Sequence, residues 1–220
     1  MSQYAISDIH GCIATFKALL DKIKFSKEDE LYLLGDYIDR GPDSKGVIDY
    51  IWDLQKSGYQ VHCLRGNHES MLLQEVINPI HYYRGEPALL RSFGITNSIF
   101  IPNQYIKWMN ELHYYMEVGN YILVHAGLNF DVPNPLEAYD DMIWIRNFHT
   151  NINKDWLNGR IIIHGHTPQR FPFLKRGHQQ MKEVGAINID GGCVFNTPGL
   201  GQLCAFELNS QELVIQKNVE

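Results

Sequence analysis

The chain has 220 residues, which is long enough for one domain with a substantial core and short for two. Its 45% apolar and 20% charged residues are ordinary for a globular protein, and this excludes the disordered and membrane-spanning classes. The formal net charge of −6 argues against nucleic acid as the main partner, because no basic stripe offsets phosphate repulsion.

The N-terminal residues, Met1 to Asp8, contain no basic region followed by an apolar stretch, so we expect no secretory signal and a cytoplasmic location. No window reaches the roughly 18 consecutive apolar residues of a membrane-spanning helix, so we expect no membrane partner. The four cysteines show no Cys-x-x-Cys spacing, which predicts buried free thiols rather than a zinc site.

The first third of the chain alternates strands and helices. Strands are predicted at residues 3–7, 31–34 and 61–64, and helices at 12–24, about 43–57 and 69–76. The apolar residues of the first helix recur at i, i+3, i+4 and i+7, and Asp43 or Ser44 can cap the second helix. This alternation predicts parallel strands joined by helical crossovers.

A different pattern begins at Asn78-Pro79. From there to about Val118 the sequence is helical, irregular and rich in aromatic residues, and we interpret residues 78–118 as a helical cap-like segment rather than an aromatic substrate cage. Further strands are predicted at residues 121–124, 160–163, 186–189, 202–207 and 213–216, and residues 142–146 should lead into a helix. No repeat or linker is visible, so residues 1–220 are predicted to form a single domain.

Five short motifs with polar side chains follow five predicted strands. They are Asp8-Ile9-His10-Gly11, Gly35 to Gly41, Gly66-Asn67-His68-Glu69, His125-Ala126-Gly127 and Gly165-His166-Thr167-Pro168. The carboxyl ends of strands in an α/β sheet share one edge, where ligands bind. Carboxylates combined with imidazoles suit a first-row transition metal better than calcium. The ordered set therefore predicts one metal centre assembled from most of the chain.

The ligand types divide between two metals. One metal would be held by Asp8, His10 and Asp36, and the other by Asp36, Asn67, His125 and His166, with Asp36 bridging the two. Two such metals acidify a bridging water and clamp both sides of an in-line displacement. Two carboxylates against two divalent cations leave the centre positive, and this charge favours a phosphate dianion.

The other polar residues of the motifs fit the same reaction. His68 could protonate the departing oxygen, and Asp39 could hold His68 in the required tautomer. Arg40 and Arg65 offer planar donors for phosphate oxygens, although surface ion pairing is the alternative interpretation for either arginine.

In this order the motifs resemble those of the phosphoprotein phosphatase family of calcineurin-like metallophosphoesterases, most closely its small bacterial and phage serine/threonine protein phosphatases, over about residues 3–206. The resemblance implies an α/β fold arranged as a four-layer α-β-β-α sandwich. It also implies two divalent transition metal ions per chain, with manganese as the leading choice and iron or zinc as alternatives. The implied reaction is phosphomonoester hydrolysis by a metal-bridging hydroxide.

Residue roles carry over by motif match. The resemblance implies the same six metal ligands, His68 as general acid with Asp39 behind it, and Arg40 and Arg65 as phosphate contacts. The segment from Met142 to Arg146 resembles the Trp-x-Arg segment of the family, and this adds Arg146 as a third phosphate contact.

Three positions refine the comparison with the family. Pro168 stands where distant members carry a second histidine, which favours the phosphoprotein phosphatase branch. Asp190-Gly191-Gly192 replaces the usual Asp-Thr-Gly; we expect Asp190 to buttress the Gly-His-Thr turn, and any role of residue 191 stays open. His164 faces the same side of its strand as His166, but the family pattern uses only the later histidine as a ligand.

These observations favour a serine/threonine protein phosphatase acting on a phosphoprotein or a small phosphoester. The alternative is a symmetrical dinucleoside tetraphosphatase that splits diadenosine tetraphosphate into two ADP, since those enzymes share the five motifs. They tend to be longer and to have Gly-Asn-His-Asp in the third motif, whereas this chain has Glu69 and only about 40 positions between His125 and His166. The basic residues of the cap-like segment, Arg84, Arg91 and Lys107, are also too sparse for a polyphosphate track.

A non-enzymatic metal-binding scaffold is a third class. It is disfavoured because every ligand and His68 are present. The natural substrate, the native metal and the oligomeric state stay open at this stage.

Overall fold

The computed structural model describes residues 1–77 and 86–220, and it has a mixed α/β fold. Residues 78–85, which include Arg84 of the expected cap-like segment, lie outside the described residues. Within the described ranges the strands form two sheets. One has the order β3-β2-β1-β8-β9 and the other has the order β4-β5-β6-β7.

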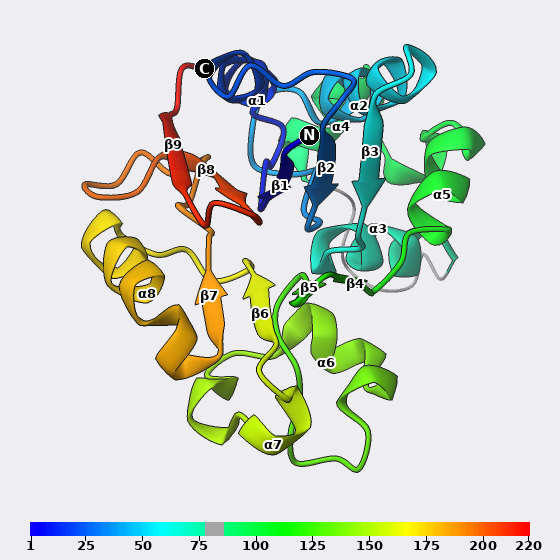
Figure 1. The fold of residues 1–220 in the computed structure, drawn as a ribbon. Coiled ribbons are helices and arrows are strands. Elements are labelled where there is room, and N and C mark those ends of the chain that lie inside the picture. The colour runs from blue at the N-terminus through cyan, green and yellow to red at the C-terminus, as the bar shows by residue number, and fades with distance from the viewer. Residues whose placement is uncertain (78–85) are drawn as a thin grey trace.

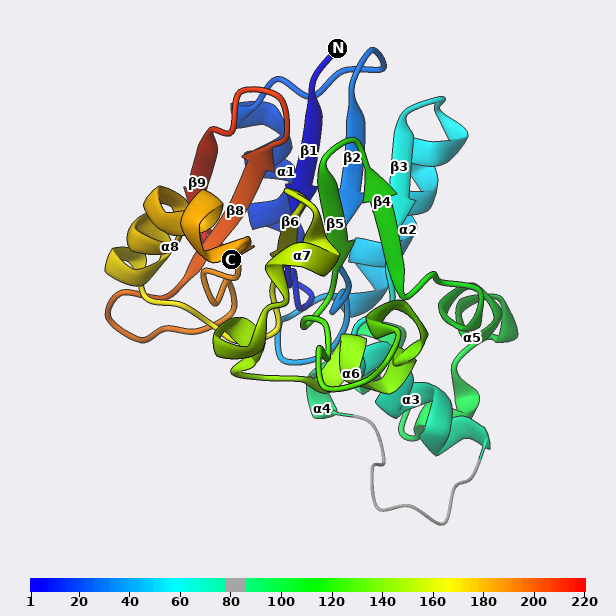
Figure 2. The same cartoon turned by 60° about the horizontal axis from the view of Figure 1, so that its bottom comes forward.

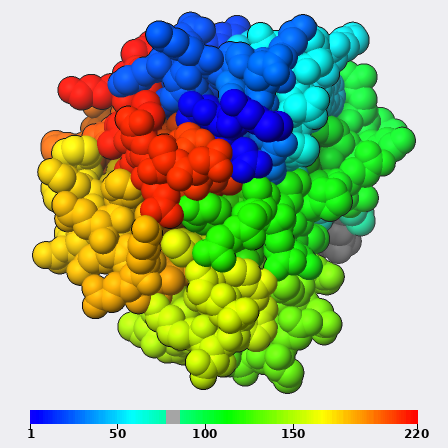
Figure 3. All heavy atoms as spheres, viewed as in Figure 1, coloured from blue at the N-terminus to red at the C-terminus, as the bar shows by residue number. Residues whose placement is uncertain are grey.

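The five-stranded sheet combines the two ends of the chain. Its strands are β1 (Gln3–Ile6), β2 (Glu30–Leu33), β3 (Gln60–Cys63), β8 (Gln202–Glu207) and β9 (Leu213–Lys217). β1, β2 and β3 are parallel, as the alternation of strands and helices predicts. β8 runs antiparallel to β1, and Figure 3 shows the red C-terminal segment beside the blue N-terminal segment. α1 (Ile13–Lys22) and α2 (Ser44–Lys56) join the parallel strands, and Asp43 caps α2 by accepting from Gly46 N at 2.8 Å.

The four-stranded sheet comes from the second half of the chain. Its strands are β4 (Tyr115–Val118), β5 (Tyr121–Val124), β6 (Ile161–His164) and β7 (Ala186–Asn188). β5, β6 and β7 are parallel, and β4 is antiparallel to β5. Three helices lie between β3 and β4 in the sequence: α3 (Asn67–Ile77), α4 (Pro87–Phe93) and α5 (Asn103–Asn110). Three more follow β5: α6 (Tyr139–Trp144), α7 (Lys154–Leu157) and α8 (Phe171–Val184). Short 3₁₀ turns occupy Ser98–Phe100, Pro135–Glu137 and Phe148–Asn151.

Three hydrophobic clusters separate four layers. The first contains buried residues of helices α1 to α5 and one face of the five-stranded sheet. The second lies between the two sheets and includes the buried residues of α8. The third lies on the outer face of the four-stranded sheet. The side chains of a strand buried on both faces alternate between two hydrophobic clusters, and β5 shows this. Its Tyr121 and Leu123 face the second cluster, while Ile122 and Val124 face the third. Figures 1 and 2 show helices outside both sheets. The predicted four-layer α-β-β-α sandwich is therefore confirmed.

Two elements differ from the sequence-based prediction. β4 falls in the segment interpreted as helical and irregular, and its four residues are at most partly buried, so it carries little periodic signal. α8 lies in a region predicted to be strand-rich; Pro172 near its start, Gly177 in its interior and only two fully buried residues, Leu174 and Met181, weaken the helical pattern. In the two described ranges of the chain, no helix combines the length and hydrophobicity that crossing a bilayer requires.

Candidate metal centre

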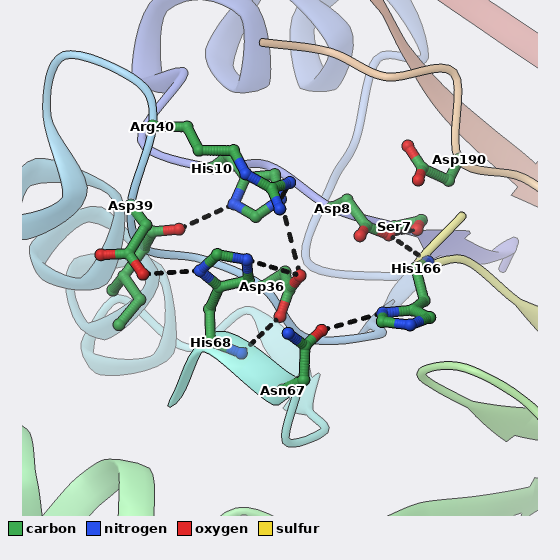
Figure 4. A network of polar contacts seen from close by, with 12 residues as sticks. Ser7, Asp8, His10, Asp36, Asp39, Arg40, Asn67, His68, His166 and Asp190 are labelled. Atoms are coloured by element: carbon green, nitrogen blue, oxygen red, sulfur yellow. Dashed lines mark hydrogen bonds and ion pairs between the residues drawn. The ribbon is translucent and has the colours of Figure 1, made fainter. Parts of the chain in front are cut away.

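The five sequence motifs meet at one place, at the carboxyl ends of β1, β2, β3, β5 and β6. The expected ligands and the expected general acid are all buried there: Asp8, His10, Asp36, Asn67, His68, His125 and His166. Figure 4 shows most of them turned toward a common point. Buried polar side chains need partners, and a group of carboxylates and imidazoles of this kind is suited to a cation.

Asp36 lies in the middle of this group. Its Oδ2 is 3.5 Å from His10 Nε2 and 3.9 Å from His68 Nε2, and its Oδ1 is 3.5 Å from His125 Nε2. Asp36 is thereby shared by two trios, His10–Asp36–His68 and Asp36–His125–His166, in each of which the ligand atoms lie within 4.8 Å of one another. One carboxylate oxygen faces each trio, an arrangement that can bridge two cations.

Backbone carbonyls fix the tautomers of two histidines. A carbonyl can only accept, so His10 Nδ1–H donates to Ile38 O at 2.8 Å and His125 Nδ1–H donates to Leu34 O at 3.0 Å. When these rings are neutral, Nε2 of each lacks a proton and faces Asp36. An imidazole held in this way through its other nitrogen is the common form of a metal-ligating histidine.

The remaining expected ligands lie beside the second trio. Asn67 Oδ1 is 2.9 Å from His166 Nδ1 and 3.0 Å from His125 Nε2. Asp8 Oδ2 accepts from His166 N at 3.0 Å and from the Ser7 hydroxyl. Among the described residues Asp8 belongs to neither trio, and His68 takes the place in the first trio that the sequence analysis gives to Asp8.

His68 is held as a proton donor. Its Nδ1–H donates to Asp39 Oδ2 at 2.6 Å, as Figure 4 shows. Burial lowers the pKa of His68, but the negative charge of Asp36 and the hydrogen bond to Asp39 outweigh burial and raise the pKa to about 9. The protonated ring keeps Nε2–H on the side of Asp36, where a reacting group would lie.

Several of these side chains are held on a strained backbone. Left-handed φ values occur at His10 (47°), Asp36 (54°), Asp39 (70°), Arg40 (66°) and His166 (69°). Non-glycine residues in this region cost on the order of 1–3 kcal/mol each and gather at functional sites. Gly66 serves the same arrangement, because a Cβ at this position would collide with Asp36 Oδ1 and Asp36 N. The fold therefore holds the motifs in place against local strain.

Two of the three arginines expected to contact phosphate flank the two trios. Arg40 is exposed, and its Nη1 donates to His10 Nε2 at 2.5 Å. Arg146 Nη1 donates to Thr167 Oγ1 at 2.9 Å, directly after His166 in the chain. Positive charge thus stands beside each trio.

The third arginine, Arg65, is buried and tied to the end of α5. Its Nη1 donates to Tyr114 Oη at 2.9 Å and its Nη2 donates to Asn110 O at 2.5 Å. Within the described residues its Nε has no hydrogen-bond partner. This nitrogen is the one left for another acceptor.

Glu69 supports the centre in a way that the sequence analysis misses. Its carboxylate accepts from Asp36 N and Gly66 N at 3.0 Å and from Tyr37 N at 2.9 Å. Burial, with repulsion from Asp36, raises the pKa of Glu69 to about 7. Glu69 therefore ties the second motif to the third and faces the backbone. Only its place one residue after His68 hints at this role.

Asn188 is a second support that the sequence does not reveal. Its Nδ2 donates to Thr167 O at 2.9 Å and holds the Gly-His-Thr turn. Asp190, expected in that role, accepts from Gly192 N at 2.8 Å through its side chain, and its main-chain carbonyl accepts from Gln169 N, two residues after the turn, at 2.8 Å. His164 is occupied elsewhere, because its Nε2 lies 3.0 Å from His149 Nε2.

The family follows from a match over most of the chain. The model of the calcineurin-like phosphoesterase family matches residues 1–189, so the chain belongs to this family of hydrolases. The resemblance seen in the motifs is confirmed. Membership implies a dinuclear metal centre, and the two trios that share Asp36 fit one.

Two curated relatives of the chain share one name. The symmetrical bis(5′-nucleosyl)-tetraphosphatase of Nitrosospira multiformis is 34% identical over 131 residues, which are 58% of this chain and 44% of that protein. The protein of the same name from Cellvibrio japonicus is also 34% identical, over 134 residues, 58% of this chain and 46% of that protein. The chain thus spans less than half the length of these relatives.

Solved structures resemble the whole chain at low identity. A candidate diadenosine tetraphosphatase has a TM-score of 0.73 at 22% identity, with 100% of this chain and 94% of that chain covered. A Saccharomyces cerevisiae serine/threonine phosphatase with similarity to human phosphatase PP5 has a TM-score of 0.68 at 17% identity, with 100% and 81% covered. At such identities the likeness shows the fold alone.

The prediction of a serine/threonine protein phosphatase is wrong, because the curated relatives are consistently named symmetrical tetraphosphatases. A phosphoprotein substrate accordingly finds no support. Two features misled the choice between phosphatase and tetraphosphatase. Glu69 faces the backbone rather than the trios, so its identity carries no information about the substrate. The small number of basic residues in the cap-like segment does not argue against a polyphosphate substrate either. Arg40 and Arg146, which lie outside that segment, supply positive charge beside the centre.

Proposed function

We propose that this protein hydrolyses dinucleoside polyphosphates and splits diadenosine tetraphosphate symmetrically into two ADP at a dinuclear metal centre. The observation that carries the proposal is that Asp36 belongs to both buried trios, so that its carboxylate can bridge two metal ions. The chain is also 34% identical to a named symmetrical tetraphosphatase over 58% of its length. The bond that breaks is then a phosphoanhydride rather than a phosphomonoester.

The metal ligands of this proposal are the six residues that the motifs indicate. They are Asp8, His10 and Asp36 for one cation and Asp36, Asn67, His125 and His166 for the other. We assign His68 as the proton donor rather than as a ligand, because its Nδ1 is hydrogen-bonded to Asp39 Oδ2 and the motif gives the ligand role to the neighbouring Asn67. Manganese suits the carboxylate and amide oxygens, and iron or zinc suits the imidazoles. When bound, the two cations acidify a water and offset phosphate charge.

The protein groups act around the inner phosphates. A water loses one proton to solvent, its oxygen bonds to one inner phosphorus, the central P–O–P bridge breaks, and His68 Nε2 gives its proton to the oxygen of the departing ADP. Asp39 keeps His68 oriented through Nδ1. A diphosphate is a weaker base than an alkoxide, so this proton transfer matters less here than it would for a phosphoserine.

The arginines would bind the rest of the polyphosphate. Arg40 beside His10 and Arg146 beside His166 lie next to different trios, so they can contact phosphates on either side of the bridge that breaks. Arg65 is the third proposed contact, through its unpaired Nε.

Product analysis tests this function. Manganese-loaded protein is incubated with diadenosine tetraphosphate and the products are separated by anion exchange. We expect ADP alone. AMP with ATP would contradict symmetrical cleavage, and intact substrate would contradict the function as a whole. Asp36→Asn should be inactive, and Asp53→Asn, which changes an exposed carboxylate of α2, is the matched control.

A further inference from the structure

A cavity of about 340 Å³ lies on the outer side of the four-stranded sheet. We call it the α8 pocket. Helix α8, the ends of β6 and β7 and the segment 145–149 form its walls, and Figure 1 shows α8 beside β7. Pockets for small molecules occupy about 300–1,000 Å³, so the volume suits one small organic group. None of the residues assigned as metal ligands lines it.

One face of α8 makes the longest wall of the pocket. Its lining residues are Phe173, Gly177, Gln180 and Val184, at the i, i+4, i+7 and i+11 positions of one helical face. Glycine inside a helix costs roughly 0.5–1 kcal/mol relative to alanine, so its presence needs a reason. A Cβ on Gly177 would meet nothing within 4 Å. Gly177 therefore leaves a recess in the centre of the wall.

One end of the pocket lies next to the metal centre. Thr167, which lines it, directly follows His166, and Arg146 at the same end donates to Thr167 Oγ1 at 2.9 Å. The ring of Trp144, two residues before Arg146, lies 6.3 Å from the ring of His166 between centroids and is 43% exposed. A ligand with phosphates at the second trio could thus pass Arg146 and extend into the pocket.

The lining suits a neutral ring with polar edges. Among the described residues that line the pocket, Arg146 carries the only formal charge. Phe148 and Phe173 offer aromatic surfaces, and the carboxamides of Gln169 and Gln180 can donate and accept at once. A carboxamide is the side-chain group that pairs with the N6 and N7 edge of adenine. The lining therefore holds both kinds of group that a base can use, hydrogen-bonding carboxamides for its edge and aromatic surface for its face.

We propose that the α8 pocket binds one nucleoside of the dinucleoside polyphosphate, with its base against Phe173 and the carboxamides and its phosphates leading past Arg146 to the second trio. This inference rests on the proposed function and adds the site that distinguishes a nucleotide from a bare phosphate chain. Binding of a diphosphate to the metal centre alone would make no use of the pocket.

The test compares the binding of ADP and of pyrophosphate, which share a diphosphate and differ in the nucleoside. Dissociation constants are measured by calorimetry on the manganese-loaded protein. We expect ADP to bind at least about tenfold more tightly than pyrophosphate, which corresponds to ~1.4 kcal/mol. Gly177→Leu, which fills the recess, should abolish this preference. Lys175→Leu adds the same side chain at an exposed position of α8 and should keep the preference.

Two outcomes would overturn the proposal. One is equal affinity of the unmodified protein for ADP and pyrophosphate, and the other is a Gly177→Leu variant that keeps the tenfold preference. Pyrophosphate affinity reports whether each variant is folded and metal-loaded. Because no turnover is needed, the binding result stands even where diadenosine tetraphosphate is not hydrolysed, and that failure would count against the proposed function alone.

Discussion

The metal centre and the α8 pocket are neighbours that are built in different ways. At the centre, buried side chains are fixed by main-chain groups: Ile38 O and Leu34 O hold two histidines, and five residues keep left-handed backbone angles. The pocket is the space beside one helical face, with Phe173 56% exposed and a glycine in the middle of the wall. The reaction is thus encoded in fixed motifs, whereas substrate selection depends on the shape left between elements.

That difference explains why the sequence reveals the chemistry and misleads about the substrate. The five motifs at the strand ends are shared by the phosphatases and the symmetrical tetraphosphatases of this family, so they do not choose between these two substrates. The discriminating surface is assembled by residues from separate segments, such as Arg146 and Gly177, whose meeting depends on the packing of α8. The variants below ask whether the two regions are as separable as this comparison implies.

The largest effect is expected at the shared ligand. Asp36→Asn should lower kcat/KM for diadenosine tetraphosphate by at least about 10³-fold, or ~4 kcal/mol in barrier, because both proposed metal sites lose a charge at once. The metal content measured by elemental analysis should fall from two ions per chain to one or fewer. Asp8→Asn should do less harm, since Asp8 is proposed for one site only. An Asp36→Asn protein with two ions and near-normal kcat/KM would refute the bridging role.

A smaller, substrate-dependent effect is expected at the general acid. Loss of a general acid costs on the order of 10²–10⁴ in rate when the leaving group is a strong base. His68→Gln should therefore slow hydrolysis of an alkyl phosphate by about this factor and diadenosine tetraphosphate by less, because diphosphate leaves more easily. The control is His62→Gln on β3, outside the motifs. Equal slowing of both substrates with both metals still bound would remove His68 from this role.

The smallest effects come from two glycines, one in each region. Gly66→Ala should destabilise the protein, because its Cβ would collide with Asp36. Gly177→Ala should raise the free energy of unfolding by about 0.5–1 kcal/mol, since its Cβ enters open space inside a helix. Urea denaturation of the two variants beside the unmodified protein measures both changes. Stabilisation by Gly66→Ala, or destabilisation by Gly177→Ala, would contradict the packing described for that region.

Local signals in the sequence account for much of the fold. Parallel β1, β2 and β3, the cap of α2 by Asp43 and the sandwich class follow from periodicity, capping residues and the family motifs. Helix α8 is not predicted because its apolar stripe is narrow, and strand β4 is not predicted because it is a short strand at the edge of its sheet. The single-domain organisation and the cytoplasmic location stay predictions.

The residues of the candidate site likewise fall into those that the sequence predicts and those that it does not. The residues at the strand ends could be predicted because each follows a recognisable strand. The partners of Glu69 could not, since the three N–H groups that it binds belong to loops whose path is set by tertiary packing. The same holds for His149, which meets His164 through a hydrogen bond across 15 residues of sequence.

Substrate choice by one manganese-loaded preparation tests the central claim most directly. kcat/KM is measured for diadenosine tetraphosphate and for a phosphoserine peptide under identical conditions. The proposed function predicts that the tetraphosphate exceeds the peptide by at least about tenfold, or ~1.4 kcal/mol in barrier, with ADP as the only nucleotide product. A peptide that is turned over more efficiently than the tetraphosphate would contradict it.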